Sequence, residues 1–355
     1  MKTNKQVQNE DENLIYFKNQ EPPIPGQKYT DPLFPPNERS LLGLNQYNKP
    51  IDNENYSEND NIFPSELEFK RPSEIFNGQK YDLFPGVIEM HDVIQGGLSD
   101  CYFLSSVANL CKFPELILSL FKTKKLNEDG FYEIIFYIDG IKQIVIVDDY
   151  IPVKRSTKWP CFSQPHENTI YVMLLEKAWA KINGGYVNVN KGLPSEALEV
   201  LTGMGSLSYD ISNKDKEDLN EYKLEIVKNV QTADKNNCFI SCSSKNDKSI
   251  EKIGLVPGHA YSVINFNEIE TSNGENVYLF RLRNPWSKGE WSGKWSDRSP
   301  LWDEKTKNQV KFNDKEDGIF LWKLMIFLII LQILIFVMFY LMQNLLLIQL
   351  KERKI

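Results

Sequence analysis

The sequence predicts an α+β fold with two lobes, a helical lobe followed by a β-rich lobe, and an apolar C-terminal segment. Its 355 residues are enough for about two domains and a large core. Helical periodicity marks much of the first half of the chain, whereas strand-like runs follow one another between residues 238 and 284. A mostly helical half and a β-rich half favour two lobes with a cleft between them.

Composition and charge exclude several classes of function. The chain has 41 Lys and Arg against 48 Asp and Glu, a net charge of −7, so we expect no nucleic-acid partner. The five cysteines form no CxxC pair and there are three histidines, so a structural zinc site is not expected. Acidic and amide residues occupy the N-terminus where a signal peptide needs an apolar run, which favours a reducing, cytoplasmic location.

Residues 29–192 are expected to form the first lobe, after a flexible N-terminal lead-in of residues 1–28. The lead-in is rich in Asn, Glu, Asp, Lys and Pro, so it can bury little surface. Asp139-Gly140 separates two β-rich runs, which is a strong signal for a hairpin. Residues 167–183 have apolar positions at helical spacing, and Gly184-Gly185 ends that helix.

Residues 193–318 are expected to form the second lobe. Shorter helical patterns cover residues 195–202 and 215–230. Three strand-like runs follow, CFISCSS, HAYSVINFNEI and VYLFRLRN, and a turn at Asn273-Gly274 separates the last two. These strands make the second lobe the β-rich one.

Cys101 is the strongest single candidate for chemistry. It follows Gly96-Gly97, and an N-cap at Ser99 or Asp100 would place it in the first turn of a helix over residues 99–113. Unpaired N–H groups and the positive end of the helix dipole favour a thiolate there, which suits a nucleophile. Taken alone, a lone cysteine beside apolar residues is more often a small buried hydrophobic residue.

Three further residues complete a candidate site. Gln95 lies six residues before Cys101, where a side-chain amide can join the Cys101 backbone N–H in stabilising an oxyanion. His259 follows the Pro257-Gly258 turn and can act as general base, and Asn284 can orient its imidazole. The structural alternatives are a solvated turn residue for Gln95, a packed histidine for His259 and an Asx turn for Asn284.

The order of these residues is that of the papain-like thiol proteases: a Cys with a Gln six residues before it, then a His, then Asn-Pro-Trp at the end of the following strand. From about Tyr29 to Gly318 the sequence resembles the protease core of the calpains, the family of intracellular calcium-dependent cysteine endopeptidases. The motifs that carry this resemblance are YTDPLFPPNERSL, FKRPSEIF, QGGLSDCYFLSSVANL, VDDYIPV, LLEKAWAKINGGY, GLVPGHAYSV and RLRNPWSKGEWSGKWSD.

The resemblance implies a papain-like two-lobed cysteine protease core that cleaves intracellular proteins in a calcium-dependent way. It implies that Cys101 is the nucleophile and His259 the base. It likewise makes Asn284 the orienting residue and Gln95 the oxyanion donor. The alternative function is a catalytically impaired, calpain-like regulatory or membrane-anchored binding protein. The complete Cys-His-Asn set argues against that alternative, because inactive relatives commonly lose one member.

The resemblance also implies regulatory Ca2+, because each calpain lobe binds one ion through carboxylates and carbonyls. The acids that match ligand positions are Asp92 in the first lobe and Glu290, Asp297 and Asp317 in the second. Thr169 and Ile319 stand where the family has further acids. Calcium prefers six to eight oxygen ligands, so the ligand set is incomplete. No EF-hand pattern is seen, so no EF-hand domain for subunit dimerisation is expected.

Residues 319–355 form an apolar tail that the family does not predict. Residues 324–342 carry no charge, and a helix of that length would span about 28 Å, close to the roughly 30 Å hydrocarbon core of a bilayer. One account is therefore a transmembrane helix over residues 324–342 that associates the protein with a membrane. The other is a gene-model artefact in which the reading frame is lost near Gly318. Both accounts stay open.

Overall fold

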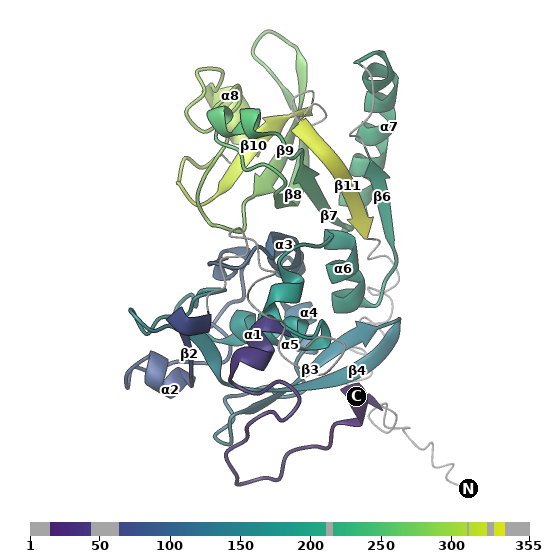
Figure 1. Cartoon of the computed structure of the whole chain (residues 1–355). Coiled ribbons are helices and arrows are strands. Elements are labelled where there is room, and N and C mark those ends of the chain that lie inside the picture. Colours follow the sequence, from purple (N-terminus) through teal and green to yellow (C-terminus); the bar gives the residue numbers. More distant parts are fainter. Residues whose placement is uncertain (1–14, 44–63, 211–215, 311, 325–329, 338–355) are drawn as a thin grey trace, which may run out of the picture.

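The computed structural model shows two parts of mixed helix and sheet, one above the other in Figure 1. It describes residues 15–43, 64–210, 216–310, 312–324 and 330–337. The lower part, called the first lobe below, is built around helices α3 (Cys101–Leu110) and α5 (Tyr171–Ile182). The upper part, called the second lobe, is built around a six-stranded sheet. Each lobe has its own large hydrophobic cluster.

A three-stranded sheet lies beside α5 in the first lobe. Strands β3 (Phe131–Ile138) and β4 (Ile141–Asp148) form the predicted antiparallel hairpin. Asp139 and Gly140 both have positive φ, 52° and 74°, as the tightest hairpin turns require. Strand β1 (Ile15–Tyr16) adds to β4 in parallel. Residues 15–17 therefore differ from the expected flexible lead-in, because β1 pairs with β4 and Phe17 packs into the first hydrophobic cluster.

The remaining elements of the first lobe are short. The α5 helix begins at Tyr171, later than expected, because Glu167 and Asn168 have positive φ values of 47° and 55° that do not fit a helix. Helix α6 follows residue 192 but packs against α3 and β3. The other bounds are α1 (Glu38–Leu42), β2 (Leu67–Lys70), α2 (Pro72–Ile75), α4 (Pro114–Ser119), β5 (Ile151–Lys154) and α6 (Pro194–Thr202).

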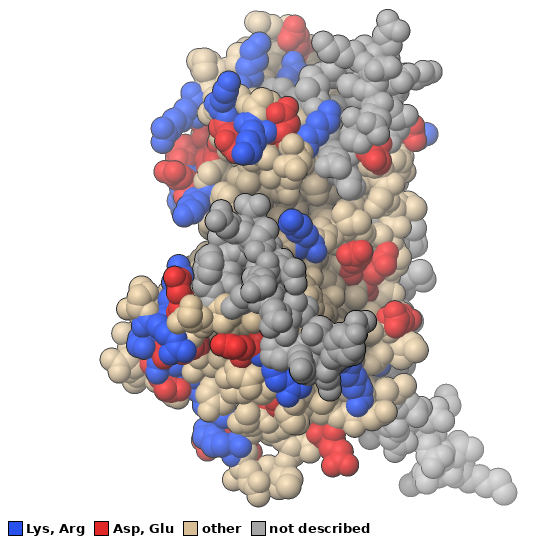
Figure 2. Space-filling view, viewed as in Figure 1, with Lys and Arg blue, Asp and Glu red and all other residues tan. Residues whose placement is uncertain are grey.

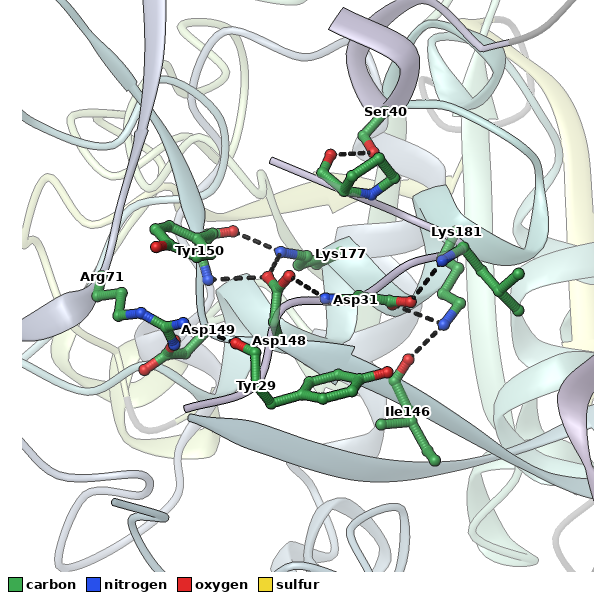
Figure 3. Close-up of polar contacts among 12 residues, drawn as sticks. Tyr29, Asp31, Ser40, Arg71, Ile146, Asp148, Asp149, Tyr150, Lys177 and Lys181 are labelled. Carbon is green, nitrogen blue, oxygen red and sulfur yellow. Dashed lines mark hydrogen bonds and ion pairs between the residues drawn. The ribbon is translucent and has the colours of Figure 1, made fainter. Parts of the chain in front are cut away.

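Buried ion pairs join several of the sequence motifs inside the first lobe (Figure 3). Lys177 of α5 contacts the Asp148 carboxylate and donates to the Tyr150 carbonyl at 2.6 Å. One turn later, Lys181 pairs with Asp31 at 2.6 Å, and the Asp31 N–H donates to Asp148 at 2.7 Å. A buried charge needs such partners because burial strips it of water. These contacts tie the segment before α1 to β4 and α5.

The second lobe is an antiparallel sheet with the strand order β10-β9-β8-β7-β11-β6. Helix α7 (Lys216–Lys235) packs against β7 and β8, and α8 (Glu304–Val310) packs against β8. The strand bounds are β6 (Ser206–Asp210), β7 (Phe239–Ser244), β8 (Ala260–Glu270), β9 (Asn276–Arg283), β10 (Ile319–Lys323) and β11 (Leu331–Val337).

The apolar tail corrects the expectation of a transmembrane helix over residues 324–342. Residues 331–337 of that range form β11, which lies between β7 and β6, and the side chains of Leu334 and Ile335 are fully buried. A run of apolar residues without alternation also suits a strand that is buried on both faces, as here. Among the described residues, no helix is long and apolar enough to cross a membrane. Residues 325–329 and 338–342 lie outside the described residues.

Helix α3 lies at the junction of the two lobes (Figure 1). The Ser262 hydroxyl of β8 donates to the carbonyl of Ser105 at 2.8 Å. The side-chain amide of Asn109 donates to the Ser241 hydroxyl of β7 at 2.9 Å. Because all four residues are buried, these bonds hold the helix that begins at Cys101 against the second sheet.

Candidate active site

Cys101 is the first residue of α3, and Asp100 is its N-cap residue, as the sequence predicts. The residue is partly exposed, and the N–H of Ala260 donates to its Sγ with an N–S distance of 3.5 Å. Burial of the thiol raises the pKa of Cys101 to about 11, although the Ala260 N–H acts in the opposite direction. In this structure the thiol is therefore protonated at neutral pH.

His259 and Asn284 form a hydrogen-bonded pair in the second lobe. His259 Nε2 and Asn284 Oδ1 are 2.9 Å apart, and both side chains are buried. The same Oδ1 accepts the N–H of Trp286 at 3.0 Å, so it is an acceptor and Nε2 carries the proton. Nδ1 is then the basic nitrogen of the ring. Burial lowers the pKa of His259 to about 4, so the imidazole is neutral at pH 7.

Trp286 covers the pair formed by His259 and Asn284. Its ring centroid is 4.8 Å from that of the imidazole. The side-chain amide of Asn284 also donates to the carbonyls of Lys288 at 2.8 Å and Gly289 at 3.2 Å. These bonds fold residues 284–289 into a tight loop that fixes the orientation of the Asn284 side chain.

Gln95 lies on the first-lobe side of the same junction. Its backbone N–H donates to the Pro285 carbonyl at 3.0 Å, and its side-chain Nε2 donates to the Leu98 carbonyl at 2.7 Å. An amide nitrogen has two hydrogens, so one remains available for an oxyanion. The next residue is Gly96, where a Cβ atom would lie 1.7 Å from the carbonyl oxygen of Phe162. Only glycine allows this close approach.

A cavity of about 740 Å³ opens beside Gln95. Its walls come from both lobes, with Trp159 and Gln164 on one side and Trp286 and Lys288 on the other. Aromatic and polar groups that converge on such a cavity are typical of a binding site.

Sequence reasoning missed two features that support these residues. The Ser244 hydroxyl accepts the His259 N–H at 3.0 Å, which fixes the start of β8 against β7. Asp100 is fully buried, and burial followed by the negative charge of Glu176 raises its pKa well above the ordinary range of a carboxyl. Burial also raises the pKa of Glu176 to about 7. Residues 100 and 176 are far apart in sequence, so no local pattern indicates this pair.

The acids expected for the second lobe gather near the end of β9. Glu290 Oε1 accepts the N–H groups of Asp317 at 3.0 Å and of Gly318 at 2.9 Å. Burial, followed by the negative charge of Glu290, raises the pKa of Asp297 to about 7. One oxygen of Asp297, Oδ2, is buried without a hydrogen-bond partner. An oxygen-only set with an orphaned carboxylate oxygen fits a calcium ion.

Asp92, the acid expected for the first lobe, has different neighbours. Its carboxylate lies 2.9 Å from Nδ1 of His166. In the part of the chain that the structure describes, His91, Asp92 and His166 are the one group of three candidate metal ligands with all ligand atoms within 4.8 Å of one another. Glu167 is exposed, and the Thr169 hydroxyl donates to the His166 carbonyl at 2.8 Å.

Comparison with known proteins decides the family. Residues 29–331 match the family described as calpain family cysteine protease. The chain belongs to the calpain family. The calpain-type cysteine protease DEK1 of Arabidopsis thaliana is 33% identical over 311 residues, which cover 83% of this chain and 13% of that protein. The calpain-1 catalytic subunit of Mus musculus is 32% identical over 301 residues, which cover 82% of this chain and 39% of that protein.

The range of the calpain match corrects one expectation about the tail. The match continues past Gly318 to residue 331, so the family pattern does not stop where the sequence analysis placed its end. The chain spans well under two thirds of the length of either calpain relative. Among solved structures, the match to the SERA5 proenzyme of Plasmodium falciparum covers 76% of this chain and 70% of the proenzyme chain. The TM-score of this match is 0.28 and the sequence identity is 14%, so it shows no more than a weak likeness.

Proposed function

We propose that this calpain-family chain is a cysteine endopeptidase with a papain-like two-lobed core. In this proposal Cys101 is the nucleophile, His259 the general base, Asn284 the residue that orients the base and Gln95 the oxyanion donor. One observation carries it: the N–H of Ala260 contacts the Cys101 thiol at 3.5 Å, one residue after His259. This contact supports the proposal because it brings the thiol at the start of α3 beside the first residue of β8, which follows His259 directly.

The proposed reaction uses each group at a stated atom. His259 Nδ1 accepts the thiol proton, and the Cys101 sulfur attacks the carbonyl carbon of a peptide bond. The oxyanion accepts hydrogen bonds from the Gln95 side chain and the Cys101 N–H. His259 then protonates the leaving amine, and water hydrolyses the thioester to release the acid. Asn284 holds the imidazole with its Nε2 proton directed away from the sulfur.

The pKa values of Cys101 and His259 indicate a resting form of the site in which both side chains are uncharged. A thiol with a pKa of about 11 and an imidazole with a pKa of about 4 favour the neutral pair over the thiolate–imidazolium pair. Because burial causes both shifts, a change that exposes the thiol would favour the ion pair. A change that brings the thiolate closer to the imidazolium would also favour it, through the attraction between the two charges. Calcium-dependent alignment of the lobes, which the family resemblance implies, is a change of this kind.

We propose that Glu290, Asp297 and Asp317 hold a regulatory calcium ion in the second lobe. The ion would supply positive charge to a group of acids whose mutual repulsion and burial raise the pKa of Asp297. The N–H of Gly318 donates to Glu290, and the carbonyl of Gly318 accepts the N–H of Asn284 at 2.8 Å. An ion bound to these acids would therefore act through Gly318 on Asn284, the residue that orients His259.

We propose that the substrates are proteins, as the protease family suggests. We also propose a reducing, cytoplasmic setting in which all five cysteines stay free thiols.

On the face that Figure 2 shows, Lys and Arg side chains are interspersed with Asp and Glu over both lobes. Mixed signs do not form the continuous basic track that phosphate backbones require.

The catalytically impaired alternative predicts an inert thiol, and labelling of Cys101 separates the two functions. The chain is treated with iodoacetamide at neutral pH in EDTA and in millimolar Ca2+, and the modified residue is identified by peptide mass mapping. We expect Ca2+ to accelerate labelling of Cys101 and to switch on cleavage of an unfolded protein substrate. Cys101→Ala abolishes the cleavage, whereas Cys111→Ala, at a buried thiol at the opposite end of α3, leaves it intact. No cleavage by the parent chain at millimolar Ca2+ would overturn the proposal.

A further inference from the structure

Two histidines and an aspartate meet on the surface of the first lobe, outside the candidate active site. His91 and Asp92 belong to the short 3-10 helix Met90–Asp92, and His166 precedes α5. Their ligand atoms all lie within 4.8 Å of one another. The two imidazole rings are edge to face, with centroids 5.0 Å apart. Among the three histidines of the chain, only His259 lies elsewhere.

The Asp92 carboxylate is held with one oxygen directed at the histidines. Its Oδ2 accepts the N–H of Glu89 at 2.9 Å and the hydroxyl of Tyr171 at 3.2 Å. Its Oδ1 is left to face Nδ1 of His166 at 2.9 Å. Bonds of this kind to the second oxygen orient a metal-binding carboxylate in many proteins.

His166 is positioned by the turn that follows it. Its carbonyl accepts both the N–H of Thr169 at 2.9 Å and the Thr169 hydroxyl at 2.8 Å. These two bonds from Thr169 fix the turn on which His166 lies, and so hold its ring beside Asp92.

The donor set matches one class of ion. Calcium takes six to eight oxygen ligands and has little affinity for imidazole. Two imidazoles with a carboxylate are typical ligands of zinc and of neighbouring transition metals, which bind histidine nitrogen at about 2.0–2.1 Å. Glu89 adds a further carboxylate, since its Oε2 is 3.2 Å from Nε2 of His91. His91 and Glu89 are about half exposed, so an ion has access from solvent.

We propose that His91, Asp92 and His166 form a binding site for a divalent transition-metal ion of the zinc class, with Glu89 as a fourth ligand. The ion would replace the hydrogen bond between His166 and Asp92 and would draw the exposed His91 ring inward. Cysteine spacing gives no sign of this site, because its ligands are histidines and carboxylates from two separate segments.

The location of the site gives the ion a structural consequence. The segment that holds His91 and the segment that holds His166 also pair further along, where the Gln164 N–H donates to the Ile94 carbonyl at 2.8 Å. Gln95 follows directly, and Gln95 and Gln164 both line the 740 Å³ cavity. An ion that joins the two segments would therefore stiffen the wall of the cavity on which the oxyanion donor lies.

Zinc binding to a chain with Cys101→Ala tests the site without any need for catalysis, so its outcome is separate from that of the proposed function. Isothermal titration calorimetry with Zn2+ measures stoichiometry and affinity, and the visible absorption of Co2+ reports nitrogen ligands. We expect one Zn2+ per chain. His91→Ala and His166→Ala, each made in the Cys101→Ala chain, should weaken binding at least about tenfold.

His259→Ala in the same Cys101→Ala chain is the matched control, because it removes the one histidine outside the cluster. We expect it to change zinc affinity less than about twofold, with each variant's fold checked by circular dichroism. His91 is exposed, so its replacement should not disturb folding. The proposal is overturned if the Cys101→Ala chain binds no Zn2+. It is equally overturned if His259→Ala abolishes binding while both cluster variants keep it.

Discussion

The guanidinium of Arg283 donates a hydrogen bond across the lobes to the main-chain carbonyl of Val93, with Nη2 and the oxygen 2.7 Å apart. Arg283 is fully buried, and burial lowers its pKa to about 10, so it keeps its charge at neutral pH. The Gln95 N–H makes a second bond across the same junction, to the Pro285 carbonyl. Residues 93–95 and 283–285, which carry the proposed oxyanion donor and orienting residue, are thus joined directly.

Arg283→Met should separate these two segments without opening a large cavity. We expect kcat for cleavage of a peptide substrate to fall about tenfold or more, since small misplacement of reacting groups is costly. Arg281→Met is the matched control, because Arg281 lies on the same strand but donates to Val310 within the second lobe. Equal loss of kcat in both variants would show that the bond to Val93 has no special role.

Asn284→Ala should leave the His259 imidazole without its acceptor. The lost hydrogen bond is buried, which corresponds to about 1–3 kcal/mol, or roughly 5- to 150-fold in kcat/KM. Asn267→Ala is the control. It removes a partly exposed hydrogen bond between the side chains of Asn267 and Asn265 on β8, and it should leave kcat/KM unchanged. Parent-like kcat/KM for Asn284→Ala would remove Asn284 from the proposed triad.

The pKa of Cys101 predicts how alkylation depends on pH in EDTA. Below a pKa of about 11 the thiolate fraction rises about tenfold per pH unit, so the rate of Cys101 alkylation should increase steadily between pH 6 and pH 9. The measurement is the rate of mass gain on the peptide that contains Cys101. A rate that is constant across this range would mean that the resting site already holds a thiolate–imidazolium pair.

Asp297 predicts how stability depends on pH and Ca2+. Its folded pKa of about 7 lies above its ordinary value of 3.8, so the group stabilises the folded state in acid, and this contribution is lost as pH rises from about 4 through 7. Asp297→Asn should therefore raise the free energy of unfolding in EDTA at pH 7 by about 1–2 kcal/mol, after allowance for solvent screening.

Urea denaturation followed by tryptophan fluorescence measures the effect of Asp297→Asn, since Trp291 lines the same pocket as Glu290 and Asp297. Millimolar Ca2+ should stabilise the parent chain and have little effect on the variant. Asp247→Asn is the control, since Asp247 is a surface N-cap elsewhere in the same lobe. Equal stabilisation of parent and Asp297→Asn by Ca2+ would contradict the calcium assignment.

Local signals in the sequence predicted those parts of the fold that depend on neighbouring residues. Gly96-Gly97 and a capped first turn indicated the helix at Cys101, and Asp139-Gly140 indicated the hairpin between β3 and β4. The pair formed by His259 and Asn284 was found because the order of motifs is specific to a family, although each residue alone is uninformative. The catalytic roles of these residues stay predictions.

Features that depend on contacts distant in sequence could not be predicted. The bond from Arg283 to Val93 and the cluster of His91 with His166 have no spacing that a pattern could detect. Of the two accounts of the tail, the transmembrane helix was wrong over residues 331–337 for a different reason. An apolar run without alternation has the same composition whether it spans a bilayer as a helix or fills the centre of a sheet as a strand, and only the neighbouring strands distinguish the two.

Leu334→Ala tests the interpretation of the tail as strand β11. Leu334 is fully buried between β7 and β6, so the substitution should lower the free energy of unfolding by about 2–5 kcal/mol. Leu207→Ala on β6 is the matched control, because that side chain is 55% exposed and should cost less than about 1 kcal/mol. A parent-like urea midpoint for Leu334→Ala would return the segment to the membrane-anchor account.

The position of β11 between β7 and β6 constrains how the second lobe assembles. During synthesis, β6 and β7 emerge long before residues 331–337, so the sheet has two unpaired strand edges until the last of its strands arrives. Closing it pairs β11 with β6, which lies more than a hundred residues earlier in the chain. This is a slow step because the loop-closure entropy is lost before the contacts form. A nascent chain would therefore complete this sheet only after residue 337 leaves the ribosome, and the unpaired edges of β6 and β7 are sites at which chains can aggregate until then.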